Sequence, residues 1–450
     1  MSEHFQTSSR LPAKSTMQYF SVSNLRAAVL GSLLATSLPW PVLAQSVEPD
    51  PVIGAPVFNN PAGSETEQYA IYQQLARIID RVPPDGYIEM SWFEFGVSYT
   101  TDTPSKPNIP ARLIKAHQRG VDIRIILDNN EKDSGQSNQD WPAYKALSQQ
   151  LGTTDTAQSF IVLCPNHKGC IAKRKIYSDT YAYNHNKFLL ASNITLTSGS
   201  TIPAIVFQSS GNLGEWDATT SWNNALTWSE AASFANYHRY FADQRKFRTS
   251  TAGDDNYYSV GASANQYKTH FFPRKETNGD LNQASTDTVV TILNSISCSY
   301  VGESDNKRHQ TDIRIVMWSF NRVSVAQKLA ELVRAGCWVD VVYTTMNDAV
   351  KSALSESNLG GKEMGLTKCA VPWQGRSLRP HSKYMLVDGA YDDDQIPRVF
   401  TGSHNYAVSA LRNADESLVR VRSKAVHEAY LRGNFYGVRD VCSGKIQPGV

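Results

Sequence analysis

The sequence has no long apolar run beyond its first 44 residues. After position 44, every apolar stretch is shorter than the run of about 18 residues that indicates a membrane-spanning helix. We therefore expect the mature chain to be soluble. Its 450 residues, 41% of them hydrophobic and 19% charged, are typical of a globular protein with a large buried core. This length favours two or three domains.

The sequence also lacks an excess of charge of one sign. It contains 44 Lys and Arg residues against 42 Asp and Glu residues, a net charge of +2. Removal of residues 1–44 would take away three basic residues and one acidic residue, and would leave 41 of each sign. Proteins that bind nucleic acids usually carry a basic surplus, so the balance weighs against a dedicated nucleic-acid enzyme. A local basic patch stays open as an alternative.

The first 44 residues have the features of a targeting segment. Arg26 precedes an apolar run over residues 27–38, and a Pro-containing stretch follows it up to Ala44. This pattern predicts a secretory signal peptide cleaved after about Ala44, and therefore a secreted or periplasmic protein. A membrane anchor is the alternative, but the run is short and is interrupted by proline. Met17 is an alternative start.

Cysteine is scarce but even in number. The six cysteines are Cys164, Cys170, Cys298, Cys337, Cys369 and Cys442. An even number in an exported chain predicts disulfides, and the short loop between Cys164 and Cys170 favours a bond between these two. The other four allow three pairings, among which the sequence does not choose. A zinc site at Cys164, His167 and Cys170 is an alternative, but it lacks a nearby fourth ligand.

Two parts of the chain repeat the same order of expected elements. Each has a strand, a helix, a glycine and a second strand, and residues 111–123 resemble residues 327–341. This order is typical of α/β units, so we expect two repeated α/β lobes. Each lobe should have a mostly parallel or mixed sheet flanked by helices, with the active site between the lobes. The alternative is a chance resemblance between amphipathic helices.

The expected boundaries follow from this repeat and from the composition. The expected domains are a signal peptide at 1–44, an N-terminal lobe at 45–250, a Ser-, Asn- and Gly-rich connector at 251–283, and a C-terminal lobe at 284–442. The expected helices are 66–82, 110–119, 286–297 and a helix capped by Ser324 that runs to Gly336, and the expected strands are 87–93, 121–127, 313–318 and 339–343.

Each half also carries a histidine and a lysine two residues apart at an apolar strand. These pairs are His185 with Lys187 and His381 with Lys383. Alternate side chains of a strand share a face, so each pair can meet one anion. A turn of small polar residues follows each pair and contributes, in the two halves, Ser210 and Asn212, and Ser403 and Asn405. Together these residues predict a pocket for a phosphate group.

Two histidines in such a pocket can divide the work of phosphoryl transfer. One imidazole attacks phosphorus and forms a phosphohistidine. The other protonates the leaving oxygen and then activates the incoming water or alcohol, which suits a group that titrates near neutrality. Lysines and amides stabilise the phosphoryl oxygens. Because the lysines supply positive charge, we expect no metal and no cofactor, and we interpret the acidic residues 392–394 as a solvated turn.

At these residues the sequence resembles the phospholipase D superfamily, whose mark is a duplicated His-x-Lys-x4-Asp motif. The resemblance covers about residues 60–440, and the C-terminal copy matches through Asp388. It implies that Glu416, eleven residues after Asn405, is an acid that orients the histidine. It also implies that His185 is the nucleophile and His381 the general acid/base, with Lys187, Lys383, Asn212, Asn405, Ser210 and Ser403 around the phosphate.

The N-terminal copy departs from this pattern. Ser192 stands where the family has aspartate, Ser209 where it usually has glycine, and Asn224 near the expected place of the second acid. We expect these changes to weaken the support of His185 while leaving the donors of the site intact.

Three functions follow as hypotheses. The first is a secreted phospholipase D-type phosphodiesterase that releases choline or a similar alcohol from phospholipids. Its lipid entrance would be formed by Trp216, Trp222 and Trp228, because indole suits an apolar–aqueous boundary. The second is a phosphodiesterase for extracellular nucleic acid or another phosphodiester, and the third is a non-catalytic protein with a decayed motif. For the first we expect a phospholipid partner at a membrane or micelle surface, no stable nucleic-acid partner, and a monomer.

Overall fold

A computed structural model of the chain describes residues 48–131, 135–261, 266–392 and 394–449. The predicted signal peptide at residues 1–44 lies outside these ranges. The described residues belong to one compact unit. Within the described ranges, no helix combines the length and the apolar character that a bilayer crossing requires.

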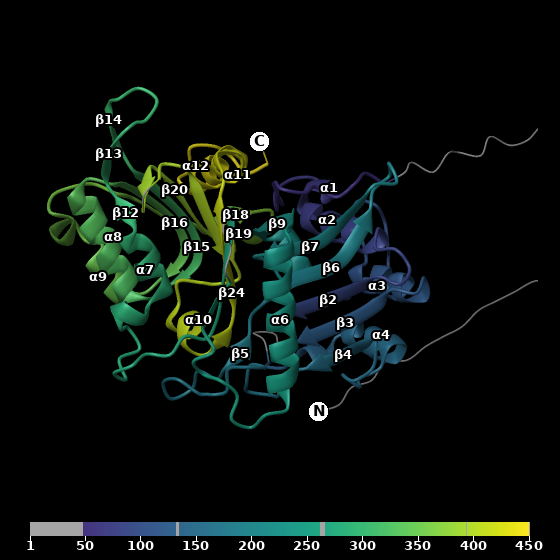
Figure 1. The fold of residues 1–450 in the computed structure, drawn as a ribbon. Coiled ribbons are helices and arrows are strands. Elements are labelled where there is room, and N and C mark those ends of the chain that lie inside the picture. Colours follow the sequence, from purple (N-terminus) through teal and green to yellow (C-terminus); the bar gives the residue numbers. More distant parts are fainter. Residues whose placement is uncertain (1–47, 132–134, 262–265, 393, 450) are drawn as a thin grey trace, which may run out of the picture. The chain divides into compact units, whose positions relative to one another are not determined.

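Two mixed β-sheets form the centres of the two lobes (Figure 1). In spatial order, the N-terminal sheet contains β1 (Pro56–Phe58), β9 (Asn224–Ser229), β7 (Thr201–Ser209), β6 (Lys187–Thr195), β2 (Tyr87–Trp92), β3 (Asp122–Leu127) and β4 (Phe160–Leu163). The C-terminal sheet contains β10 (Ser259–Gly261), β11 (Tyr267–Phe271), β24 (Ser417–Arg422), β22 (Arg398–Gly402), β20 (Lys383–Asp388), β15 (Asp312–Phe320), β16 (Trp338–Met346) and β17 (Gly365–Lys368).

The two sheets pair their strands in the same way. β2 is parallel to β3 and antiparallel to β6, and β15 is likewise parallel to β16 and antiparallel to β20. The strands after β6 and after β20 continue with antiparallel pairing. Of the two sheet types that we expected, the mixed one is present. The prediction of two repeated α/β lobes is confirmed.

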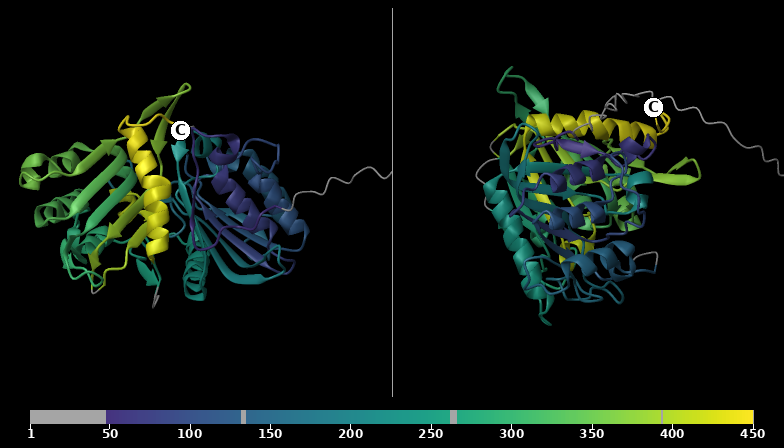
Figure 2. Two further views of the ribbon diagram at one scale, coloured as in Figure 1. Left: turned by 90° about the horizontal axis from the view of Figure 1, so that it is seen from above. Right: turned by 90° about the vertical axis from the view of Figure 1, so that its right-hand side faces the viewer.

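Helices cover the outer face of each sheet and fill the space between the sheets (Figures 1 and 2). The N-terminal sheet packs against α2 (Ala70–Asp80), α3 (Ile109–Gln118) and α4 (Pro142–Leu151), and the C-terminal sheet against α7 (Thr288–Asn294), α8 (Val323–Ala335) and α9 (Asp348–Ala353). Between the sheets lie α6 (Ala231–Arg248) and a helix formed by α11 (Lys424–Tyr430), a π-helical turn (Leu431–Phe435) and α12 (Tyr436–Cys442). Apolar side chains of both sheets share this middle core, so the lobes pack as one body.

Most of the expected helices and strands are found within a few residues of their predicted bounds. The expected helix over 66–82 is divided into α1 (Glu65–Gln68) and α2. α8 ends at Gly336, whose φ of +103° favours glycine. Ser324 is not its N-cap, because the Ser324 hydroxyl instead donates to Asp287. The expected connector at 251–283 contains β10 and β11, which extend the C-terminal sheet.

Two short parallel ladders join the lobes next to the predicted motifs. β5 (Tyr183–Asn184) pairs with β23 (Ala414–Asp415), and β8 (Ser221–Trp222) pairs with β19 (Arg376–Pro380). β5 and β19 come directly before the two His-x-Lys segments. Each histidine is therefore fixed at a strand that belongs to its own lobe and is paired with the other lobe.

Three disulfides involve all six cysteines. The predicted bond between Cys164 and Cys170 is formed. Its two sulfurs are thereby used, so the alternative zinc site at Cys164, His167 and Cys170 is excluded. The other bonds are Cys298–Cys337 and Cys369–Cys442, a pairing that the sequence left open.

Candidate active site

The two predicted histidines lie at one cleft of about 580 Å³. Each histidine precedes its strand, whereas the lysine two residues later begins it, at β6 for Lys187 and at β20 for Lys383. The backbone amides of His185 and His381 donate to the carbonyls of Asp415 and Trp222, at 2.9 and 2.8 Å, in the short ladders between the lobes. The segments that the sequence separates by almost 200 residues thus meet.

Both lysines are buried beneath the histidines. Lys187 Nζ donates to the carbonyl of His185 (2.8 Å), and Lys383 Nζ donates to the carbonyl of His381 (2.5 Å). Burial, and next the charge of Lys187, lower the pKa of Lys383 well below its usual value. Two buried amines, of which Lys187 lowers the pKa of Lys383, would gain from an anion in the cleft.

A buried acid of the opposite lobe holds His185. Glu416 Oε1 lies 2.8 Å from His185 Nδ1, and the Glu416 side chain is fully buried. Burial raises the pKa of Glu416 to about 8, against the lowering effect of Lys187. This geometry fixes Nδ1 of His185 and thereby the orientation of the ring.

His381 has two oxygen partners, and both come from the N-terminal lobe. Asp217 Oδ1 and Asn223 Oδ1 lie 3.2 and 3.1 Å from His381 Nδ1. The sequence did not indicate Asp217. Asn224 stands near the expected place of the second acid, but Asn223, one position earlier, is the residue that contacts His381. Asn224 instead donates to Thr401 and Tyr430 in the buried region between the lobes. The spacing of eleven residues from Asn212 could have identified Asn223.

The charges around His381 act in opposite directions. Burial, followed by the charge of Lys383, lowers the pKa of His381 to about 4, while Asp217 acts to raise it. Burial alone would raise the pKa of Asp217, but its bond to His381, the amide of Asn212 and the charge of Lys383 bring it below its usual value. Asp217 is therefore a carboxylate at neutral pH.

The asparagines and the serines of the two polar turns lie in different surroundings. Asn212 lines the cleft, and the Asn405 side-chain oxygen accepts the amide of Ser319 (3.3 Å). Ser210 and Ser403 are fully buried, and their hydroxyls donate to Asn223 (2.9 Å) and to the carbonyl of Ser417 (3.4 Å). These two serines therefore support the walls of the site and do not face the cleft.

The motif positions at the far ends of the strands lie away from the histidines. Asp388 ends β20, five residues after Lys383, which corresponds to about 17 Å along a strand. Ser192 lies five residues after Lys187 in β6 and accepts the amide of Tyr87 (3.0 Å). The expectation that Ser192 weakens the support of His185 is wrong, because Glu416 gives that support and Ser192 secures the distant end of the sheet.

Aromatic side chains flank both histidines. Phe93 and Tyr183 contact His185, with ring centroids 4.8 and 5.6 Å away. Trp318 and Trp216 contact His381 at 5.0 and 5.8 Å.

Only one of the three clustered tryptophans is placed as we expected. Trp216 lines the cleft and is 42% exposed, but Trp222 and Trp228 are buried. The expectation of a three-tryptophan entrance is wrong, because β8 and β9 carry the other two indoles into the core. Glu94, Glu131 and Arg379 complete the polar lining of the cleft.

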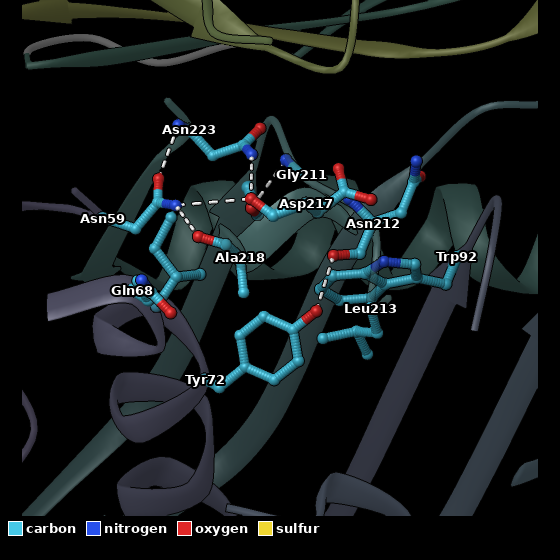
Figure 3. A pocket seen from close by; sticks show the side chains of 12 residues that line it. Asn59, Gln68, Tyr72, Trp92, Gly211, Asn212, Leu213, Asp217, Ala218 and Asn223 are labelled. Carbon is cyan, nitrogen blue, oxygen red and sulfur yellow. Dashed lines mark hydrogen bonds between the residues drawn. The ribbon is translucent and has the colours of Figure 1, made fainter. Parts of the chain in front are cut away.

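Figure 3 shows how the region behind Asp217 is held. The short helix α5 (Glu215–Thr219) carries Asp217 beside Asn212 and Asn223. Asn59 donates to the carbonyls of Asp217 and Ala218, at 3.3 and 2.9 Å. These bonds tie the acid to a segment that precedes β2 in the chain.

A family model and several solved structures are similar to this chain. Residues 87–245 and 307–433 match the family model described as "Cardiolipin synthase, PLD-like domain". The phosphatidylserine synthase of Haemophilus influenzae has a similar structure, with a TM-score of 0.52, 13% identity, and 87% of each chain covered. No curated protein matches the sequence significantly.

Two further solved structures are similar at lower TM-scores. For the polyphosphate kinase of Porphyromonas gingivalis the score is 0.49 at 13% identity, and the match covers 88% of this chain and 55% of that one. The chain thus spans about half the length of that kinase. For Nuc of Salmonella typhimurium, described as a phospholipase D family member, the score is 0.26 at 16% identity, over 38% of this chain and 94% of that one.

The family model covers well over half of the chain and falls on both lobes. Its two matched ranges contain both histidines, both lysines and all three acid or amide partners of the histidines. The chain therefore belongs to the phospholipase D superfamily, whose members act on phosphodiester bonds.

Proposed function

We propose that the protein is a secreted or periplasmic phospholipase D-type phosphodiesterase that hydrolyses the head-group phosphodiester bond of phospholipids. The observation that carries this proposal is the pair of histidines at one cleft, each with its Nδ1 held by buried oxygen atoms of the opposite lobe. With Nδ1 of each ring held in this way, we assign the two Nε2 atoms to the chemistry, one to attack phosphorus and the other to transfer a proton.

In the proposed reaction His185 is the nucleophile. Its Nε2 attacks phosphorus, a P–N bond forms, and the P–O bond to the head-group alcohol breaks. His381 donates a proton to the leaving oxygen and then takes a proton from water, whose oxygen attacks phosphorus and breaks the P–N bond. The anionic substrate offsets the charge of Lys187 and Lys383, which raises the pKa of His381 from its value in the free site and allows it to carry that proton.

The lining of the cleft supports a phospholipid with a cationic head group. The carboxylates of Glu94 and Glu131 and the indoles of Trp216 and Trp318 face the same cleft as the histidines. Aromatic faces and carboxylates together suit a quaternary ammonium group such as choline. The phospholipid chemistry named for the matched family and for the Haemophilus influenzae synthase also supports a lipid substrate. The three disulfides support export to an oxidising compartment.

The test uses the purified mature chain with phosphatidylcholine in detergent micelles, in the presence of EDTA, and separately with plasmid DNA. We expect release of choline and phosphatidic acid, and exchange of the head group when ethanol is added. DNA cleavage without choline release would instead favour a nuclease. Head-group exchange without hydrolysis would favour a phosphatidyltransferase, and inactivity on all substrates would contradict the proposal. The matched control is the double variant His185→Ala with His381→Ala.

A further inference from the structure

The two copies of the active-site sequence differ in where they carry an acid. Eleven residues after Asn405 the C-terminal copy has Glu416, whereas eleven residues after Asn212 the N-terminal copy has Asn223. Five residues after Asn212 comes Asp217, and five residues after Asn405 comes an alanine, Ala410. The N-terminal copy thus has an acid five residues after its asparagine (the early position) and an amide eleven residues after it (the late position). The C-terminal copy has an alanine at the early position and an acid at the late position.

The short ladders between the lobes show that Asn223 and Glu416 are structural counterparts. The residue before Glu416 accepts the backbone amide of His185, and the residue before Asn223 accepts the backbone amide of His381. Each side chain then reaches Nδ1 of that same histidine, at 2.8 Å for Glu416 and 3.1 Å for Asn223. The position that carries an acid for His185 therefore carries a neutral amide for His381.

Asn223 can hold a neutral histidine but has no charge to balance a protonated one. Its side-chain nitrogen donates to the carbonyl of Asp217 (3.0 Å) and to Ser221 (2.9 Å), which turns its oxygen toward His381. That oxygen also accepts the hydroxyl of Ser210 (2.9 Å). The amide thus fixes the orientation of the ring only.

Asp217 brings the missing charge from another element. Its Oδ1 lies 3.2 Å from His381 Nδ1 and accepts the backbone amide of Asn212 (2.9 Å), and the residue is 5% exposed. In the other lobe, α10 (Val408–Arg412) follows Asn405 at the same distance in sequence as α5 follows Asn212, and it carries the fully buried Ala410. Only the N-terminal of the two copies therefore has an acid at the early position, and it is also the copy that has an amide instead of an acid at the late position.

We propose that Asp217 is a positioning residue that does for His381 what Glu416 does for His185. It holds the Nδ1 proton of His381, keeps Nε2 toward the cleft, and links the ring to the backbone of the Asn212 turn. Around His381, the positive charges that Asp217 must balance are those of Lys383 and Lys187. The indoles of Trp216 and Trp318, which also contact the ring, carry no formal charge. The inference rests on the proposed function for its kinetic consequence.

The kinetic test moves the charge between the two positions. We expect Asp217→Asn to lower kcat by about 10²–10⁴-fold with a smaller change in KM, because an amide cannot balance the imidazolium. Asn223→Asp added to Asp217→Asn places a carboxylate at the counterpart of Glu416, and we expect it to recover at least about tenfold of the loss. Glu215→Gln, which removes an exposed acid on the same helix, is the control and should leave kcat unchanged.

A second measurement does not depend on turnover. In the free protein, the ring nitrogens of His381 are titrated by NMR, with the resonance assigned by its absence from His381→Ala. We expect Asp217→Asn to lower the pKa of His381 by about one pH unit or more and Asn223→Asp to restore it. An unchanged titration in a folded Asp217→Asn protein would overturn the inference. If the titration of His381 changes as expected but the wild-type protein is inactive on every substrate, the positioning role of Asp217 stands and the proposed function is overturned.

Discussion

The two lobes hold their histidines with side chains taken from each other, but with different chemistry. His185 of the N-terminal lobe is bound by Glu416 of the C-terminal lobe, whereas His381 of the C-terminal lobe is bound by Asp217 and Asn223 of the N-terminal lobe. Neither lobe alone contains a complete histidine site. The middle core that both sheets share and the short ladders next to the histidines bring these side chains together.

The difference between the two acids is one of environment. Glu416 is fully buried, and burial raises its pKa to about 8. Asp217 accepts a backbone amide and faces His381, and its pKa is lowered despite burial. A carboxylate beside an imidazole can balance the charge of its protonated form, which suits a proton carrier. Asp217 therefore fits the proposed role of His381 as general acid and base.

The largest effect is expected from the histidines themselves. His185→Ala and His381→Ala should each lower turnover by about 10⁴-fold or more, because each removes a group that the other cannot replace. With a phosphorus-labelled substrate, His381→Ala should retain label on His185, whereas His185→Ala should retain none. Label retained by His185→Ala would reverse the proposed roles, and full activity without either histidine would exclude a two-histidine mechanism.

Glu416→Gln should change both activity and the dependence of stability on pH. We expect about a 10²-fold loss of kcat, because an amide holds His185 less well. Burial raises the pKa of Asp415 to about 7 and of Glu416 to about 8, so the folded chain keeps protons that the unfolded chain releases above about pH 4. The stability from these two acids is therefore present at low pH and is lost as the pH rises to 8.

His381 has the opposite dependence. Its pKa is lowered to about 4, so the unfolded chain binds the extra proton below about pH 6.5, and stability is lost as the pH falls from there toward 4.

The measurement for Glu416→Gln is urea unfolding at several pH values. For the wild type we expect the free energy of unfolding to fall by roughly 1–3 kcal/mol between pH 6 and 8.5, and Glu416→Gln should reduce this slope. Glu428→Gln, at an exposed surface pair, is the control. A slope that Glu416→Gln leaves unchanged would contradict the role given to burial.

A smaller effect is expected at the aromatic side of His381. Trp216→Ala should raise KM for phosphatidylcholine by about tenfold with little change in kcat, because the proposed site for the cationic head group includes this exposed indole of the cleft. KM for a phospholipid with a neutral head group should change less. Trp338→Ala serves as the control, because Trp338 is an exposed indole at the first residue of β16. Equal effects on both substrates would argue against a cation site.

The smallest effect is expected at Ser192. Replacement by aspartate restores the motif residue, yet the side chain lies five residues along β6 from Lys187 and accepts the backbone amide of Tyr87. Activity should stay within about twofold and stability within about 0.5 kcal/mol. A large gain in kcat, measured under the same conditions as the wild type, would show that the motif aspartate acts on His185 after all.

The sequence predicted the duplicated fold and the two histidines that meet at one cleft because both depend on local patterns. Periodicity located most strands and helices, and the spacing from His185 to Lys187 and from His381 to Lys383 repeated within one chain. It missed Asp217, because an acid in a five-residue helix has no periodic signal. It also misplaced Trp222 and Trp228, since a cluster in sequence says little about which face a turn presents.

The sequence alone indicated two similar α/β lobes, each with a histidine, a lysine and an asparagine in the same order. The tertiary structure was needed to pair each histidine with an acid of the other lobe and to pair the remaining four cysteines. The two histidine contacts join residues more than 150 positions apart, from Glu416 to His185 and from Asp217 to His381. Spacing within one lobe can indicate an acid such as Glu416, but the packing of the two sheets on a common core decides which histidine that acid meets.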